Sequence, residues 1–143
     1  MFKNILFPVN LQDTALSDKA LGLAIQQARS AGASLTVMTV APGFGMPIVA
    51  SYFPDNAVQE ALKEIARQLE AYVAERIPAD IQTRAVVTEG NPAEQIIGQA
   101  KEAGVDLIII PSHDRELEHV LLGSVAARVA RHAPCSVLVI KGT

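Results

Sequence analysis

Five short runs rich in Ile, Val and Leu predict five β-strands. They cover Ile5–Val9, Leu35–Val40, Ile81–Val87, Asp106–Ile110 and Ser136–Ile140. Most of these runs lack strict polar–apolar alternation, which is typical of strands buried on both faces of a parallel sheet. The third run, IQTRAVV, is more polar and therefore favours an edge position.

Amphipathic segments separate the five runs and predict four helices. Apolar residues recur at intervals of three and four in Thr14–Ala31, Ala57–Arg76, Pro92 to about Gly104, and Gly123–His132. Gly32 follows the first segment, where a left-handed stop is favoured. Asn56 and Asn91 precede the second and third segments at N-cap positions, and Pro92 suits the first helical turn.

The alternation of strands and helices predicts an α/β fold, with three layers built around an open, doubly wound parallel sheet. We expect the five strands in the order 3-2-1-4-5 and one domain over residues 1–143. The one long connection is Ala41–Asn56. Connections of this length are binding lids or mobile surface segments, and the sequence leaves both alternatives open.

Composition and charge narrow the classes of partner. The chain has 12 basic and 15 acidic residues, a formal charge of −3 and a pI near 5.6, which provides no global attraction to nucleic acid or to an anionic membrane. A single cysteine excludes an internal disulfide. The chain shows no signal peptide, and its apolar runs are shorter than the roughly 20 residues of a membrane-spanning helix. We therefore expect a soluble cytoplasmic protein.

Candidate ligand-binding residues follow two of the predicted strands. Ligands of open α/β sheets bind beyond the carboxyl ends of the strands, where the strand order reverses. This crevice would lie between the end of the first strand, at Pro8, Val9 and Asn10, and the end of the fourth, at Ile110, Pro111, Ser112 and His113. Val40 would form its wall, and backbone groups of Val9 and Val40 would pair with a planar heterocycle.

The start of the last predicted helix has the outline of a phosphate site. Gly123 lets a ligand approach the backbone, and Ser124 and Val125 open the helix. The free N–H groups and the positive dipole end of such a helix favour an anion. The alternative interpretation is that Gly123 is an ordinary turn residue and Ser124 an ordinary N-cap, since Gly-Ser is common at helix starts.

Four stretches of the chain resemble the universal stress protein family: ILFPVN, EGNPAEQII, DLIIIPSH and LLGSVAARVARHAPCSVLVIK. They occur in the family's order and span essentially the whole chain. The resemblance implies a Rossmann-like fold of the adenine nucleotide alpha hydrolase type and a role in stress response. It also implies a homodimer through the last strand, at Ser136, Val137, Leu138, Val139 and Ile140.

The same resemblance implies that the ligand is ATP or another adenine nucleotide, such as AMP. It assigns Pro8, Val9, Asn10 and Val40 to adenine and ribose. The phosphates would contact Ile110, Pro111, Ser112, Gly123, Ser124 and Val125, with His113 and Arg115 as further donors.

The chain departs from the ATP-binding pattern of that family, which reads Gly, two residues, Gly, nine residues, Gly, then Ser or Thr. Pro111 and Asp114 stand where the first two glycines belong, eight residues separate Asp114 from Gly123, and Asn10 replaces the usual aspartate. Proline lacks a backbone donor. Residues 114–118 carry two net negative charges, which oppose a triphosphate. Donors on His113 and Arg115, and a Mg²⁺ ion bridging acid to phosphate, would offset this repulsion.

Other constellations in the sequence are weaker. The cluster His113, Asp114, Glu116, Glu118 and His119 has the composition of a metal site, but its spacing favours a solvated loop. Cys135 is expected to behave as a small apolar residue. The chain lacks a GxSxG nucleophile elbow and a GxGxxG dinucleotide loop. We therefore expect a protein that is not an enzyme, with weak ATP hydrolysis as the remaining option.

Two functions are compatible with these observations. The first is a regulatory domain that binds an adenine nucleotide in the crevice between the first and fourth strands. The second is a nucleotide-independent homodimeric interaction module, which pairs through the unprotected edge of Ser136–Ile140 and serves an unidentified protein partner.

Overall fold

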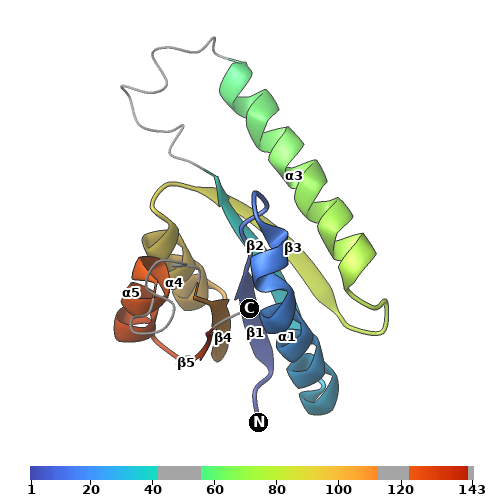
Figure 1. Cartoon of the computed structure of the whole chain (residues 1–143), viewed down its shortest axis with the longest axis vertical. Helices are drawn as coiled ribbons and strands as arrows, with labels where there is room; N and C mark the ends of the chain where they lie inside the picture. The colour runs from blue at the N-terminus through green and yellow to red at the C-terminus, as the bar shows by residue number, and fades with distance from the viewer. Residues whose placement is uncertain (42–55, 113–122, 142–143) are drawn as a thin grey trace.

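The fold is built on a five-stranded parallel sheet (Figure 1). A computed structural model describes residues 1–41, 56–112 and 123–141. Its strands are β1 (Asn4–Pro8), β2 (Ser34–Ala41), β3 (Thr83–Glu89), β4 (Leu107–Pro111) and β5 (Ser136–Ile140). Their order is β3-β2-β1-β4-β5, and all four neighbouring pairs are parallel. The predicted strand order is therefore confirmed.

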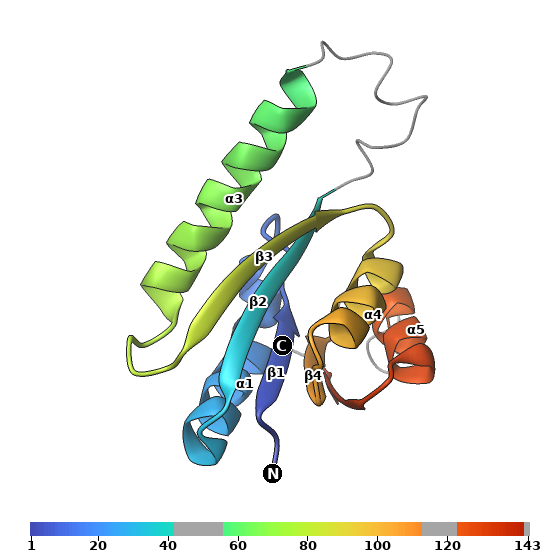
Figure 2. The same ribbon diagram turned by 180° about the vertical axis from the view of Figure 1, so that it is seen from behind.

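Helices cover both faces of the sheet, which confirms the three-layer prediction. They are a 3-10 turn η1 (Thr14–Ser17), α1 (Asp18–Ala31), α3 (Ala57–Arg76), α4 (Pro92–Glu102) and α5 (Ser124–His132). Figures 1 and 2 show α1 and α3 on one face and α4 and α5 on the other. Each predicted helix is present within two residues of its expected limits, apart from the first, which opens with the 3-10 turn.

Two buried cores hold the layers together. Ile5 and Phe7 of β1 pack under α1 and α3, whereas Leu6 packs under α4 and α5 together with Met38 and Ile108. Successive side chains of a strand point to opposite faces, so one short strand supplies both cores. All five of these side chains are fully buried, which explains why the strand runs are apolar without alternation.

The helix ends follow the predicted signals with one exception. Gly32 ends α1 with φ of 66°, and the side chain of Asn91 accepts a hydrogen bond of 3.1 Å from the backbone N–H of Glu94. Asn56 stands at the N-cap of α3 but makes no side-chain cap bond. Its backbone angles (φ −89°, ψ −13°) are helical rather than extended. The predicted N-cap position of Asn56 is therefore confirmed, but its side chain makes no capping bond.

The third strand begins two residues later than its apolar run. Ile81 is buried, but its N–H donates to the carbonyl of Pro78 in the turn that precedes β3. The run is apolar at that point because the turn packs against the α1–α3 core, so the predicted start at Ile81 is wrong. The edge position is confirmed, and Arg84 and Ala85 are exposed.

Helix α3 packs on the sheet mainly through its C-terminal half. Leu69 and Tyr72 are its buried residues, whereas the apolar residues Val58, Leu62 and Ile65, nearer its N-terminus, are half-buried. Figures 1 and 2 both show the N-terminal half of α3 extending past the end of the sheet.

The connection predicted as a lid or surface loop falls almost entirely at residues 42–55, outside the described ranges. Among the helices that the structure describes, none is both long enough and apolar enough to cross a membrane.

Candidate functional site

A cavity of about 660 Å³ opens at the carboxyl ends of β1, β2 and β4. This is where the chain connections leave the sheet in opposite directions, between β1 and β4. Its described lining residues come from three strand ends and the N-terminal parts of two helices: Pro8, Val9, Asn10, Met38, Thr39, Val40, Pro92, Ile96, Ile110, Pro111, Gly123, Ser124, Val125 and Ala126.

The structure brings nine of the predicted site residues together around this cavity. They are Pro8, Val9, Asn10, Val40, Ile110, Pro111, Gly123, Ser124 and Val125. Ser112 follows directly after β4 but is not among the described lining residues. His113 and Arg115 lie outside the described residues. Contact of any of these residues with a ligand stays a prediction.

Five lining residues were not predicted: Met38, Thr39, Pro92, Ile96 and Ala126. Pro92 carries a usable sequence signal, because a helix that follows a parallel strand begins at the same edge of the sheet where that strand ends. Ile96 lies one helical turn further on. Its place at the cavity depends on how α4 packs across the sheet, which periodicity does not specify.

The junction of β1 and β2 fixes the backbone of Val9. Its N–H donates to the carbonyl of Met38 (2.8 Å), and its carbonyl accepts from the Thr39 hydroxyl (2.9 Å). Thr39 is only 5% exposed. A carbonyl oxygen has a second lone pair, so Val9 can still accept a hydrogen bond from a ligand but can no longer donate one.

Val40 places its backbone groups beside the cavity. The β1–β2 pairing ends at Pro8 and Met38, and Val40 lies two residues beyond Met38 on the same edge of β2. Ala41, on the other edge, accepts from the N–H of Gly90 on the β3 side. Because alternate residues of a strand direct their amide groups to opposite sides, the N–H and carbonyl of Val40 face the space past the end of β1.

Asn10 closes a turn after β1 with its own side chain. Its Oδ1 atom accepts from the N–H of Gln12 (2.9 Å), and its backbone carbonyl accepts from the N–H of Asp13 (3.1 Å). The side-chain Nδ2 group of the exposed Asn10 remains as a donor for a ligand. An asparagine in this turn therefore offers N–H groups to a sugar oxygen, where an aspartate would only accept.

The N-terminus of α5 supplies anion-binding groups. The first helical bond runs from the N–H of Ala127 to the carbonyl of Gly123 (2.9 Å). The N–H groups of Ser124, Val125 and Ala126 precede it, and all three residues line the cavity. Within the described part of the chain these three N–H groups have no acceptor, and such groups at the positive end of a nine-residue helix favour a negatively charged ligand.

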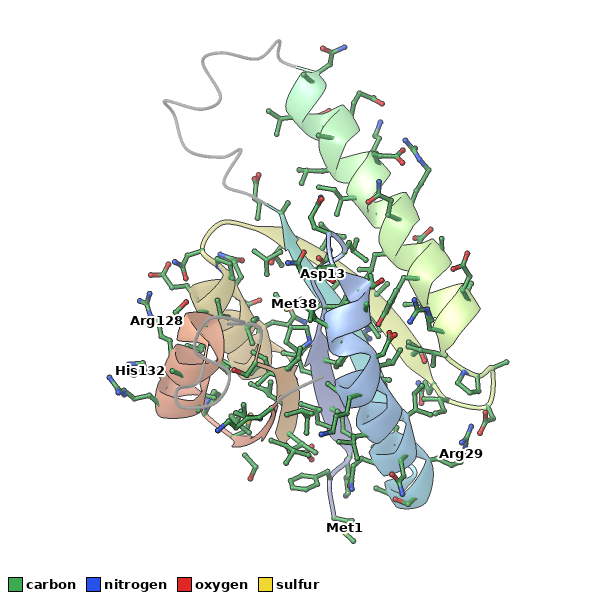
Figure 3. All side chains as sticks on the ribbon, viewed as in Figure 1. Met1, Asp13, Arg29, Met38, Arg128 and His132 are labelled. Carbon is green, nitrogen blue, oxygen red and sulfur yellow. The ribbon has the colours of Figure 1, made fainter. Side chains whose placement is uncertain are left out.

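Ionisable side chains are absent from the described lining of the cavity, which has no Lys, Arg, His, Asp or Glu. Arg128 and His132 of α5 point outward, away from the sheet (Figure 3), and Arg128 pairs with Glu94 at 3.3 Å. Over the described ranges, no group of three or more His, Cys, Asp or Glu side chains could hold a metal ion. The described lining therefore offers a ligand apolar side chains at the strand ends and N–H groups at the start of α5.

Cys135 is unsuited to act as a nucleophile. Burial raises the pKa of its thiol, and the Asp106 carboxylate raises it further. The side chain packs against the α4–α5 core. A raised pKa disfavours the reactive thiolate, which agrees with the predicted role as a small apolar residue.

Comparisons with known proteins match the sequence and the fold of this chain. The model of the universal stress protein family matches residues 1–141. The chain is 31% identical over 150 residues to universal stress protein MJ0531 of Methanocaldococcus jannaschii, covering 99% of this chain and 83% of the relative. The structure of UspA from Lactobacillus plantarum superposes with a TM-score of 0.70 at 26% identity, covering 98% of each chain.

Two further solved structures of similar fold contain nucleotides. The universal stress protein from Archaeoglobus fulgidus in complex with dAMP superposes with a TM-score of 0.65, and a universal stress protein in complex with cAMP with 0.61. Each is 21% identical to this chain. The alignment covers 98% of this chain for the dAMP complex and 99% for the cAMP complex, and 98% of each of the two neighbours. On the full-length match of sequence and fold, the chain belongs to the universal stress protein family.

Proposed function

We propose that this chain is a stress-response regulatory domain that binds an adenine nucleotide, ATP or AMP, in the crevice between β1 and β4. The observation that carries the proposal is the cavity of about 660 Å³ with apolar strand ends on one side and the amide-rich start of α5 on the other. The dAMP and cAMP complexes of structurally similar proteins support the same class of ligand.

Adenine fits the strand-end side of the cavity by its hydrogen-bonding pattern. The Val9 carbonyl can only accept, and the Val40 backbone offers one donor and one acceptor. Adenine presents an amino donor beside a ring nitrogen acceptor, which these groups complement. Guanine carries a carbonyl oxygen in place of that amino group, and this oxygen would face the Val9 carbonyl with like partial charge.

The test is thermal melting of nucleotide-stripped protein with excess ATP, AMP or GTP, each with and without Mg²⁺. A ligand at a hundred times its dissociation constant adds about 2.7 kcal/mol, which raises the melting temperature on the order of 5 to 10 °C for a domain of this size. We expect a rise with ATP and AMP and a smaller one with GTP. No rise with ATP or AMP would refute the nucleotide site.

Two matched glycine variants test whether the nucleotide binds at this cavity. Gly123→Val should abolish the rise, because Gly123 is buried, lines the cavity and precedes the free N–H groups of α5. Its φ of −57° is one that valine adopts readily, so the fold should survive. Gly22→Val is the control, since a Cβ atom added at Gly22 on α1 meets nothing within 4 Å. An equal nucleotide response in both variants would contradict the assignment.

We further propose that the protein is a homodimer paired through β5. This strand is an edge of the sheet, and Leu138 is 38% exposed there. An exposed apolar edge strand is a template for pairing with a second copy.

If nucleotides do not bind, the β5 edge supports the alternative function, a nucleotide-independent interaction module with an unidentified protein partner. A single cytoplasmic domain remains our expectation for the chain.

A further inference from the structure

Ser112 connects three parts of the fold at the edge of the cavity. Its N–H donates to the carbonyl of Ile140 at the end of β5 (2.9 Å), and its Oγ atom accepts from the N–H of Gly123 at the start of α5 (2.8 Å). Ser112 itself directly follows β4. One residue therefore ties the ends of two strands to the helix whose amides face the cavity.

The bond to Gly123 joins positions eleven residues apart in the chain. Closing a segment of that length restricts the chain and costs entropy, so the start of α5 depends on contacts that hold it in place. Gly123 is buried, and within the described structure the Ser112 hydroxyl is the acceptor of its N–H, so removing Oγ would leave this donor without that partner. The serine hydroxyl thus fixes the peptide group from which α5 begins.

The bond to Ser112 occupies the N–H of Gly123 and leaves the next three N–H groups of the chain available to a ligand. Gly123 donates to Ser112, whereas Ser124, Val125 and Ala126 lie before the first helical bond and line the cavity. Ser112 is not among the described lining residues. Its Oγ atom accepts from the N–H of Gly123, a contact within the protein that the sequence did not predict.

We propose that Ser112 is a positioning residue of the nucleotide site, which aims the three free N–H groups of α5 at one phosphate group. This inference rests on the proposed function and adds a role that acts through Gly123. It predicts that the Ser112 hydroxyl matters for the phosphate and not for the adenosine part of the ligand.

The decisive variant is Ser112→Ala, which removes Oγ but keeps the backbone N–H that binds Ile140. Calorimetric titrations with AMP and with adenosine should show AMP affinity lowered on the order of five- to tenfold and adenosine affinity unchanged within twofold. Ser112→Thr retains a hydroxyl and should restore AMP affinity. Ser30→Ala, an exposed serine of α1, is the matched control and should bind both ligands as the unaltered protein does.

Amide exchange of the ligand-free protein tests the mechanism separately. The Gly123 amide should exchange at least tenfold faster in Ser112→Ala than in the unaltered protein, and Ser112→Thr should retain the protection. Loss of AMP affinity without faster exchange at Gly123 would mean that Ser112 contacts the phosphate directly, which overturns the proposal. Equal losses for AMP and adenosine would mean a general structural role, and unchanged AMP affinity would mean none.

A titration with inorganic phosphate, followed by the amide resonances, tests the role of Ser112 independently of nucleotide binding. In the unaltered protein, phosphate should shift the amide resonances of Ser124, Val125 and Ala126, and in Ser112→Ala it should shift them less. If adenine nucleotides do not bind but this pattern appears, the nucleotide proposal fails and the role of Ser112 stands. If phosphate leaves these amides unmoved in the unaltered protein, the role of Ser112 is overturned.

Discussion

The hydroxyl of Thr39 donates a 2.9 Å hydrogen bond to the carbonyl oxygen of Val9, across the junction of β2 and β1. The regular pairing of these strands ends at Pro8 and Met38, one residue earlier. A side chain therefore continues the connection where the backbone ladder stops, and both residues line the cavity. The bond between Thr39 and Val9 therefore holds the ends of β1 and β2 together at the candidate site in the absence of a ligand.

Thr39→Val should destabilise the protein by about 1 to 2 kcal/mol, because it deprives a buried carbonyl of its donor. Thr88→Val on β3 is the matched control, since the Thr88 hydroxyl is buried and, within the described structure, has no hydrogen-bond partner. Removal of the Thr88 hydroxyl should leave the free energy of unfolding unchanged or raise it. Urea denaturation of both variants gives the two free energies, and an equal cost in both would show that the Thr39–Val9 bond contributes nothing specific.

Tyr72 should make the protein less stable at high pH. Burial raises the pKa of its phenol to about 12, with the Arg76 guanidinium opposing the shift and Asp18 adding to it. Between pH 10 and 12 the unfolded chain loses this proton first, so stability is complete below pH 10 and is lost as the pH rises. The loss at pH 11 should be on the order of 1 kcal/mol.

The comparison that isolates Tyr72 is Tyr72→Phe, followed by urea denaturation at pH 8 and pH 11. The phenol oxygen is buried without a hydrogen-bond partner among the described residues, so the variant should be at least as stable as the unaltered protein at pH 8. It keeps the ring that lies 5.4 Å beneath the Arg76 guanidinium. A stability difference that is the same at both pH values would contradict the raised pKa.

Leu138→Asp should convert the proposed homodimer to monomers in sedimentation velocity. The exposed Leu138 side chain makes it a better test than Val139, which packs against the α4–α5 core, so a charge there would also unfold the protein. Ala85→Asp puts the same charge on an exposed position of β3, the opposite edge, and should leave the dimer intact. Dissociation by Ala85→Asp alone would place the interface at β3.

The sequence predicts those parts of the fold and site that local chemistry determines. Asn91 and Gly32 mark helix ends because capping and left-handed backbone depend on one residue and its neighbours. Pro8 and Ile110 reach the cavity because strand order fixes which strand ends meet. The bond of Ser112 to Gly123 could not be predicted from the sequence, because it depends on the relative placement of β4 and α5, which no local pattern encodes.

ATP and AMP should bind with affinities within about threefold of each other in the absence of Mg²⁺. The three free amides of α5 match the oxygens of one phosphate, and the described cavity lining has no cationic side chain for a second or third. In the sequence, residues 114–118 between Ser112 and Gly123 carry two net negative charges, so their composition gives no reason to expect attraction for further phosphates. Calorimetric titrations at low salt measure both constants. ATP binding more than tenfold tighter than AMP would contradict a single-phosphate site and would assign the additional donors to residues 113–122.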